Sequence, residues 1–163
     1  MGPALPCPAG DNEYHTAFLA RVVDSFTRVT GGSLGLDVHD KTLGRRIYSA
    51  DFALLTHRGD AQATLNYGNA LALKLWDCDW ARFTALPSRA TAPQEASLAR
   101  DDLMARVARD NFVTDYSGKR ISATGRLFLI RNVTVWRLLD EPANAFGVAA
   151  TFRDYEYLPE PAQ

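Results

Sequence analysis

Few residues of this chain are of types that could do chemistry, and they are scattered along it. Of the three histidines, only His57 falls at the end of an expected buried strand. A nucleophilic mechanism needs such a base beside a serine or cysteine, together with an oriented third group. The chain has no Gly-x-Ser-x-Gly, paired-glycine nucleotide loop or His-Glu-x-x-His motif. We therefore predict that the protein is not an enzyme. A small cone-shaped α+β enzyme that uses His57 stays an alternative, although it lacks an obvious carboxylate partner.

Polar side chains set among aromatic ones indicate a binding pocket instead. Asn132 lies in the middle of an apolar strand, where an unpaired buried amide costs about 1–3 kcal/mol. Arg89 follows Pro87 and could hold an anionic group or pair with an aspartate. A well-filled aromatic core would explain the same residues without a ligand. The predicted ligand-binding residues are His57, Tyr67, Asn69, Trp76, Trp80, Arg89, Asn132 and Trp136.

Helices are expected on both sides of this region. Apolar residues recur at helical spacing between Tyr14 and Val29, and Gly31 ends the pattern. Near the middle of the chain, the last expected helix has Leu103 inward and Arg100 mostly outside. Helices are predicted over residues 11–30, 41–48, 70–76, 79–83 and 93–109.

The remaining segments alternate as strands do. Strands are predicted over residues 52–57, 63–67, 112–122, 126–138 and 146–152, with turns at 58–60, 123–125 and 141–145. Alternation within 126–138 predicts one shared face for Phe128, Ile130, Asn132, Thr134 and Trp136. Both faces of that strand are largely apolar, so both should be covered. The central helices can cover one face, and the N-terminal helix of the same chain or of a second subunit the other.

The order of two strands, a helical flank and a three-stranded meander is that of a PAS domain. Residues 15–32, 52–92 and 115–136 also resemble the MEKHLA domain, a PAS-like family of stand-alone bacterial proteins and plant class III homeodomain-leucine-zipper proteins. The Phe-x-x-Leu-Pro-Ser-Arg segment at 83–89 is distinctive of it. The most specific match is the Asn-Tyr-x-Asn pattern with its following helix, met by Asn66, Tyr67, Asn69, Ala72, Leu73, Leu75 and Trp76.

This resemblance implies an α+β fold, a PAS-like five-stranded antiparallel sheet with a helical flank and an N-terminal amphipathic helix. It also implies a sensory or regulatory module that binds a small molecule between sheet and helices and signals through protein contacts. A ligand-free protein-interaction or dimerisation module is the alternative. The expected partners are a small-molecule ligand, a second copy bound through the N-terminal helix and a downstream protein of unknown identity.

The resemblance does not name a cofactor, and two PAS cofactors are disfavoured. A haem-binding PAS domain takes an axial histidine from the helix before the third strand, and residues 92–111 contain none. In a light-sensing PAS domain, a flavin-reactive cysteine would fall near Ala90, and Cys78 lies well before it. The cofactor is therefore left unknown, without haem or a flavin–thiol adduct.

Composition limits the remaining possibilities. The net charge of −1 argues against a nucleic-acid surface, and no apolar run approaches the roughly 20 residues of a membrane span. Two cysteines without metal spacing and an N-terminus unlike a signal peptide predict a cytoplasmic protein. The expected organisation is a flexible tail at 1–10, a helical extension at 11–50, the PAS-like domain at 51–155 and a C-terminal tail at 156–163.

Overall fold

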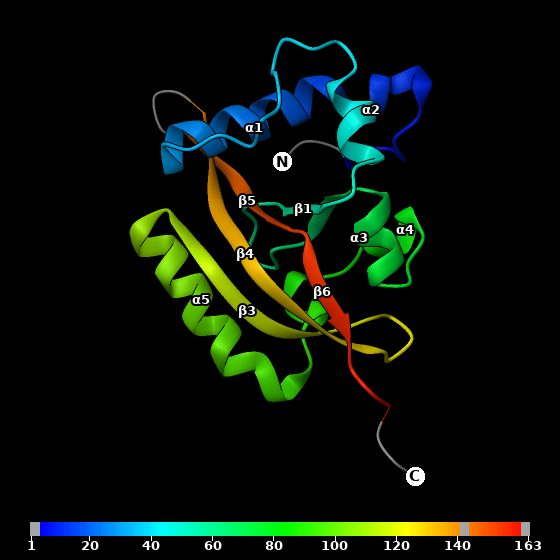
Figure 1. The fold of residues 1–163 in the computed structure, drawn as a ribbon, viewed down its shortest axis with the longest axis vertical. Coiled ribbons are helices and arrows are strands. Elements are labelled where there is room, and N and C mark those ends of the chain that lie inside the picture. The colour runs from blue at the N-terminus through cyan, green and yellow to red at the C-terminus, as the bar shows by residue number, and fades with distance from the viewer. Residues whose placement is uncertain (1–3, 141–143, 161–163) are drawn as a thin grey trace.

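The strands form one antiparallel sheet. The computed structural model describes residues 4–140 and 144–160 (Figure 1). Sheet order is β2-β1-β5-β4-β3, and β6 also pairs with β4. The strands are β1 (Ala53–His57), β2 (Leu65–Gly68), β3 (Phe112–Ile121), β4 (Leu127–Asp140), β5 (Asn144–Phe152) and β6 (Asp154–Tyr157). The helical segments are η1 (Gly10–His15), α1 (Thr16–Thr30), α2 (Leu43–Tyr48), α3 (Ala70–Leu75), α4 (Trp80–Phe83), η2 (Ser88–Thr91), η3 (Gln94–Ala96) and α5 (Ser97–Asp110).

The sixth strand was not predicted. β5 and β6 are separated only by Arg153, and both pair with β4 in the same register from Leu138 back to Phe128. Residues 156 and 157, assigned to a tail from the sequence, therefore belong to the sheet. The Tyr157 ring packs edge-on against Phe128 at 6.2 Å, and Glu156 pairs with Arg131 at 2.6 Å. These cross-strand contacts hold a segment too polar and short to be recognised alone. Of the predicted turn at 141–145, residues 141–143 lie outside the described residues.

Strand β4 contains a bulge that changes which side chains share a face. It carries one extra residue between Ile130 and Val133, and Asn132 in that stretch has a left-handed φ of 54°. Ile130 and Val133 consequently face the same side, and Trp136 faces the other. The predicted common face of Phe128, Ile130, Asn132, Thr134 and Trp136 is therefore wrong. A bulge shifts the two-residue alternation of side chains by one residue. The apolar pattern of the strand does not reveal where the bulge lies.

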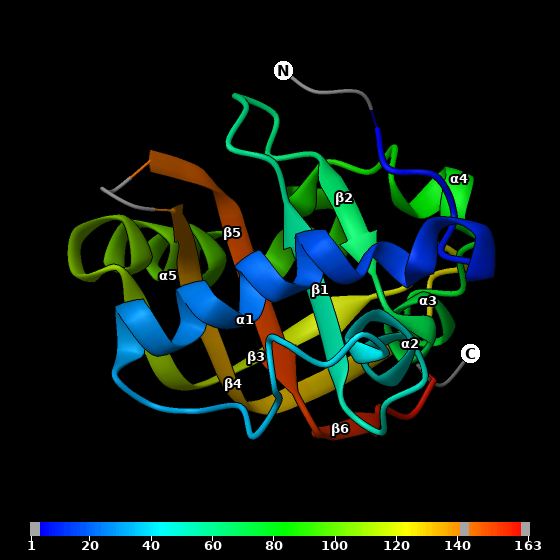
Figure 2. The same cartoon turned by 90° about the horizontal axis from the view of Figure 1, so that it is seen from above.

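Helices α1 and α2 cover one face of the sheet, called the back face here. Figure 2 shows α1 lying across the strands. Leu19, Val22 and Val23 of α1 pack against Trp136 and Leu138 of β4. The buried Ser25 hydroxyl donates to the Arg137 carbonyl and accepts from the Leu139 amide, where the β4–β5 register shifts. The apolar stripe of the N-terminal helix is thus buried by the sheet of its own chain.

Helix α1 begins later than predicted. Glu13, Tyr14 and His15 have φ between 51° and 60°, so the chain bends before Thr16. The preceding residues contact the fold: the Trp80 indole donates to the Leu5 carbonyl at 2.9 Å. The proposed division into tails, extension and domain remains a prediction. No helix within residues 4–140 and 144–160 is long and apolar enough to span a membrane.

Candidate functional site

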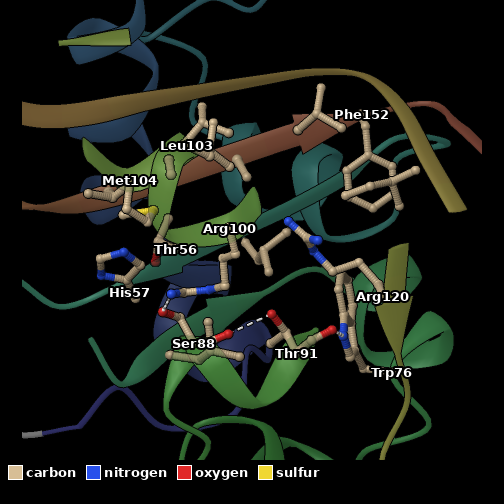
Figure 3. Close-up of a pocket in the computed structure, with 18 residues that line it drawn as sticks. Thr56, His57, Trp76, Ser88, Thr91, Arg100, Leu103, Met104, Arg120 and Phe152 are labelled. Carbon is tan, nitrogen blue, oxygen red and sulfur yellow. Dashed lines mark hydrogen bonds between the residues drawn. The ribbon is translucent and has the colours of Figure 1, made fainter. Parts of the chain in front are cut away.

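A cavity of about 70 Å³ lies on the other face of the sheet, the front face, between the strands and the segments η2 and α5 (Figure 3). Side chains from β1, β4 and β5 give it an apolar wall that includes Leu55, Val135 and Phe152. A single water needs about 10–15 Å³ of such space, so the cavity has room for several waters or a small organic molecule. Six polar residues also line it: Thr56, His57, Ser88, Thr91, Arg100 and Arg120.

Arg100 reaches the cavity from the first turn of α5. It lies three residues before the buried Leu103 and so shares the inner face of this helix. Its side chain is only 13% exposed, and its guanidinium donates a short hydrogen bond to the Ser88 hydroxyl. The nearest carboxylate, that of the exposed Asp101, lies 3.8 Å away. Burial, and then the charge of Arg120, lower the pKa of Arg100. Arg100 nevertheless carries its proton at neutral pH, because arginine is not deprotonated in proteins.

Arg120 approaches the same space from β3. The residue is 7% exposed, and its guanidinium donates to the neighbouring Lys119 carbonyl at 2.8 Å. Figure 3 shows the Arg100 and Arg120 guanidinium groups reaching into one pocket from two elements. Within the described ranges, no acidic side chain lies within ion-pair distance of Arg120. The site therefore brings the charges of the buried Arg120 and the partly buried Arg100 together without a buried negative one.

His57 completes the polar lining at the end of β1. Its Nδ1 contacts the Arg58 carbonyl at 2.7 Å, so Nδ1 carries the proton and donates. Its Nε2 is then an acceptor, and it is buried with no hydrogen-bond partner. Burial lowers the pKa of His57, and the Arg100 charge adds to the shift against the opposing effects of the Arg58 carbonyl and Asp60. His57 is therefore neutral at neutral pH.

This neutral state predicts a pH dependence of stability. Because the folded-state pKa lies below the ordinary 6.5, the unfolded chain binds the His57 proton first as the pH falls. The free energy of unfolding should therefore decrease between pH 7.5 and pH 5.5. Urea denaturation at the two pH values measures it. The decrease should be smaller in His57→Gln, which keeps His15 and His39; equal decreases in both proteins would contradict the assignment.

Solved structures share this arrangement of sheet and helices. The PAS domain of a protein from Colwellia psychrerythraea matches with a TM-score of 0.59 at 12% identity, over 68% of this chain and 91% of that chain. A light-oxygen-voltage domain studied with a flavin analogue matches at 0.59 and 13%, over 76% and 90%. The PAS domain of a LuxR-family transcriptional regulator from Burkholderia thailandensis, in complex with ethanol, matches at 0.51 and 18%, over 70% and 95%. At such identities the likeness shows the fold alone, and it confirms the predicted PAS-like α+β class.

A comparison of the sequence with known families identifies the family of this chain. The MEKHLA domain matches residues 16–157, which is most of the chain. The chain belongs to the MEKHLA domain family. This PAS-like family is one of sensory and regulatory modules, and the predicted resemblance is confirmed. A comparison with curated proteins gave no match.

Two of the predicted ligand-binding residues of this MEKHLA domain line the cavity. One is His57, and the other is Trp76 at the end of α3. The Trp76 ring is 1% exposed and packs edge-on against Phe128 at 5.0 Å. Its indole donates to the Thr91 carbonyl at 3.2 Å, which fixes η2 over the pocket. Trp76 therefore forms a wall of the cavity and has already used its hydrogen-bond donor.

Asn69 is fully buried but lies away from the cavity. Its Oδ1 accepts from the Leu54 amide at 3.1 Å and from the Ala72 amide at 3.2 Å. Its Nδ2 donates to the Ile47 carbonyl at 2.9 Å and to the Phe52 carbonyl at 2.7 Å. One side chain thus caps α3 and ties it to β1 and α2. Its polar atoms are all engaged by the backbone, so Asn69 has a structural role in the MEKHLA domain.

Three of the predicted aromatic residues belong to the back face. Tyr67 and Trp136 are buried beneath α1, and Trp80 packs on the same cluster. The Trp80 ring contacts Tyr67 edge-on at 5.8 Å, and Phe26 does the same to Trp136 at 5.0 Å. The register shift between β1 and β2 and the bulge in β4 turn the Tyr67 and Trp136 rings away from the cavity. They form core around α1.

Arg89 and Asn132 also lie outside the cavity. Arg89 is exposed in η2, and its guanidinium is 3.4 Å from the Gln62 side-chain oxygen. Asn132 is exposed at the β4 bulge, beside Thr134 and Arg153 on the back side. The expected buried amide is not buried, because Asn132 lies exposed in the bulge, where it adopts a left-handed φ that asparagine tolerates better than most residues.

The two arginines that line the cavity were missed. The prediction that Arg100 lies mostly outside the apolar face of its helix is wrong, because Arg100 lines the cavity. The available signal was spacing: it precedes Leu103 by three residues and Val107 by seven, both of them buried. Arg120 had no comparable signal, because two register shifts in β3 obscure the alternation that places it inward.

Proposed function

We propose that this MEKHLA domain is a sensor that binds a small molecule in the front-face cavity and passes its occupancy to another protein. The observation that carries the proposal is the set of buried polar groups in an otherwise apolar space, including the unpartnered Nε2 of His57. Ligand pockets are mostly apolar with a few placed polar groups. A cavity with only a packing role would be lined by apolar atoms.

The size of the cavity limits the ligand. Pockets for drug-sized ligands and cofactors usually measure about 300–1,000 Å³. A volume of about 70 Å³ does not accommodate a flavin ring system. Cys78, whose thiol contacts the Trp76 carbonyl, does not line the cavity. We therefore propose a ligand much smaller than a flavin, comparable to the ethanol in the complex of the LuxR-family PAS domain.

Helix α5 is the element through which occupancy would reach the surface. Arg100 lines the cavity, and Leu98, two residues earlier, is 83% exposed. A ligand held by Arg100 would favour one position of α5 over others.

We place the protein in the cytoplasm, since both cysteines are free thiols. A ligand-free interaction or dimerisation module remains the second candidate. The predicted dimer through the N-terminal helix would have to use the outer side of α1.

A cavity-filling variant tests this function. Ala150→Leu adds a branched group to a side chain that lines the cavity, and Ala105→Leu adds the same group on the exposed side of α5. A ligand present at about 100 times its Kd should raise the Tm of the wild type by about 5–10 °C. We expect a metabolite screen by thermal shift to find such ligands. Their effect should persist in Ala105→Leu and vanish in Ala150→Leu. If no compound shifts the wild type, or if Ala150→Leu responds equally, the cavity is not a ligand site.

A further inference from the structure

The two cavity arginines leave most of their hydrogen-bonding capacity unused. A guanidinium has five N–H donors. In the described part of the chain, Arg100 makes one hydrogen bond, to Ser88, and a 3.8 Å contact with Asp101. Arg120 makes one, to the Lys119 carbonyl. Arg120 is 7% exposed and the Arg100 side chain is 13% exposed, so little of either group is open to water.

The location of both guanidinium groups in one cavity also has an electrostatic cost. Like charges in a medium of low dielectric constant repel strongly, and an uncompensated buried charge is destabilising. Several arginines elsewhere on this protein have carboxylate partners, as Arg21 has in Asp140 at 2.6 Å. The cavity wall itself includes neither aspartate nor glutamate. An anion bound in the cavity would supply a buried negative charge that the described residues do not.

The rest of the cavity selects the kind of anion. The polar groups come from η2, α5 and β3, whereas the facing wall from β1, β4 and β5 is aliphatic apart from Thr56, His57 and Phe152. A carboxylate offers two oxygens to guanidinium groups on one side and an apolar chain on the other. A phosphate would turn unpaired oxygens toward the aliphatic wall, which is costly. A cavity of about 150 Å³ holds benzene, so one of about half that volume suits an acid of roughly two to four carbons.

We propose that the cavity binds a short-chain carboxylate whose oxygens accept hydrogen bonds from Arg100 and Arg120 and whose carbon chain packs against Val133 and Val135. This inference rests on the proposed sensory function and names its ligand class.

Matched probes test the charge requirement on the unaltered protein. Acetate, propionate and butyrate are titrated against the full chain in a carboxylate-free, phosphate-free buffer at constant ionic strength. Thermal shift and calorimetry report binding. Propionamide, the uncharged isostere of propionate, and inorganic phosphate serve as comparisons. Propionate should bind at least tenfold more tightly than either. Equal or tighter binding of propionamide, or of phosphate, would overturn the carboxylate assignment.

Arginine variants then locate the anion. Arg100→Gln and Arg120→Gln should each weaken propionate binding at least tenfold, and Arg89→Gln, which changes an exposed arginine nearby, should leave it unchanged. If all three variants bind propionate as the wild type does, the assignment of the carboxylate to Arg100 and Arg120 is wrong. The probes on the wild type keep the test decisive if a variant does not fold.

Different results would refute the sensor function and the carboxylate assignment. If neutral compounds bind the wild type but not Ala150→Leu, and the carboxylates bind no more tightly than propionamide, the sensor is retained and the carboxylate is refuted. Absence of any cavity ligand, neutral or charged, would refute both.

Discussion

Asn69→Ala should lower the free energy of unfolding by about 3–4 kcal/mol, which is exceptional for so small a truncation. The side chain makes four backbone hydrogen bonds at a site with no solvent exposure. Its removal leaves the Leu54 amide and the Ile47 and Phe52 carbonyls in the interior without their side-chain partner. Each such buried group costs about 1–3 kcal/mol, partly relieved if water enters. Urea denaturation followed by circular dichroism measures the change.

Asp79→Ala is the matched control for this variant. Asp79 caps α4 as Asn69 caps α3, by accepting from a backbone amide, that of Arg82 at 2.8 Å. Asp79 is exposed and joins no other element through this bond. Its loss should cost about 1 kcal/mol, the usual contribution of an N-cap. Similar losses in the two variants would show that Asn69 acts as a cap alone and that its links to β1 and α2 contribute nothing.

Val22→Asp should destabilise the protein by more than about 4 kcal/mol, a large fraction of the about 5–15 kcal/mol that stabilises an ordinary domain. Val22 is fully buried between α1 and the back face. The residues packed around it form an apolar cluster, so the new carboxylate would be buried among hydrophobic side chains. Thermal denaturation and sedimentation velocity would register an unfolded or aggregated chain.

Ala17→Asp is the control, since it places the same charge on the exposed side in the first turn of α1, where the helix dipole favours it. We expect a change within about 0.5 kcal/mol. The pair also tests the dimerisation hypothesis. If the apolar stripe of α1 served a second copy of the chain, Val22→Asp would yield a folded monomer from a dimeric wild type. That outcome would contradict the packing of α1 on its own sheet.

Much of the secondary structure follows from local patterns. The helix near Ser97–Asp110, the hairpin of β1 and β2 and the long strand β4 are each predicted within a few residues. Element order alone indicated the PAS-like class, because consecutive strands joined by turns pair antiparallel and the inserted helices must cover a face. The specific Asn-Tyr-x-Asn pattern indicated the family. Asn69 in this pattern is explained by its four hydrogen bonds, which require an amide able to donate and accept at once.

The candidate site depends on tertiary structure to a much greater degree. Sequence patterns determined that the chain would form a PAS-like α+β fold with an amphipathic N-terminal helix, since those features depend on periodicity and turn residues. The composition of the cavity depends instead on where alternation is interrupted. The bulge at Asn132 turns Trp136 to the back face and Val133 to the front, and the register shifts in β3 bring Arg120 inward. Only the folded sheet places Arg120 opposite Arg100, about twenty residues apart in sequence, and that juxtaposition leads to the proposed anion site.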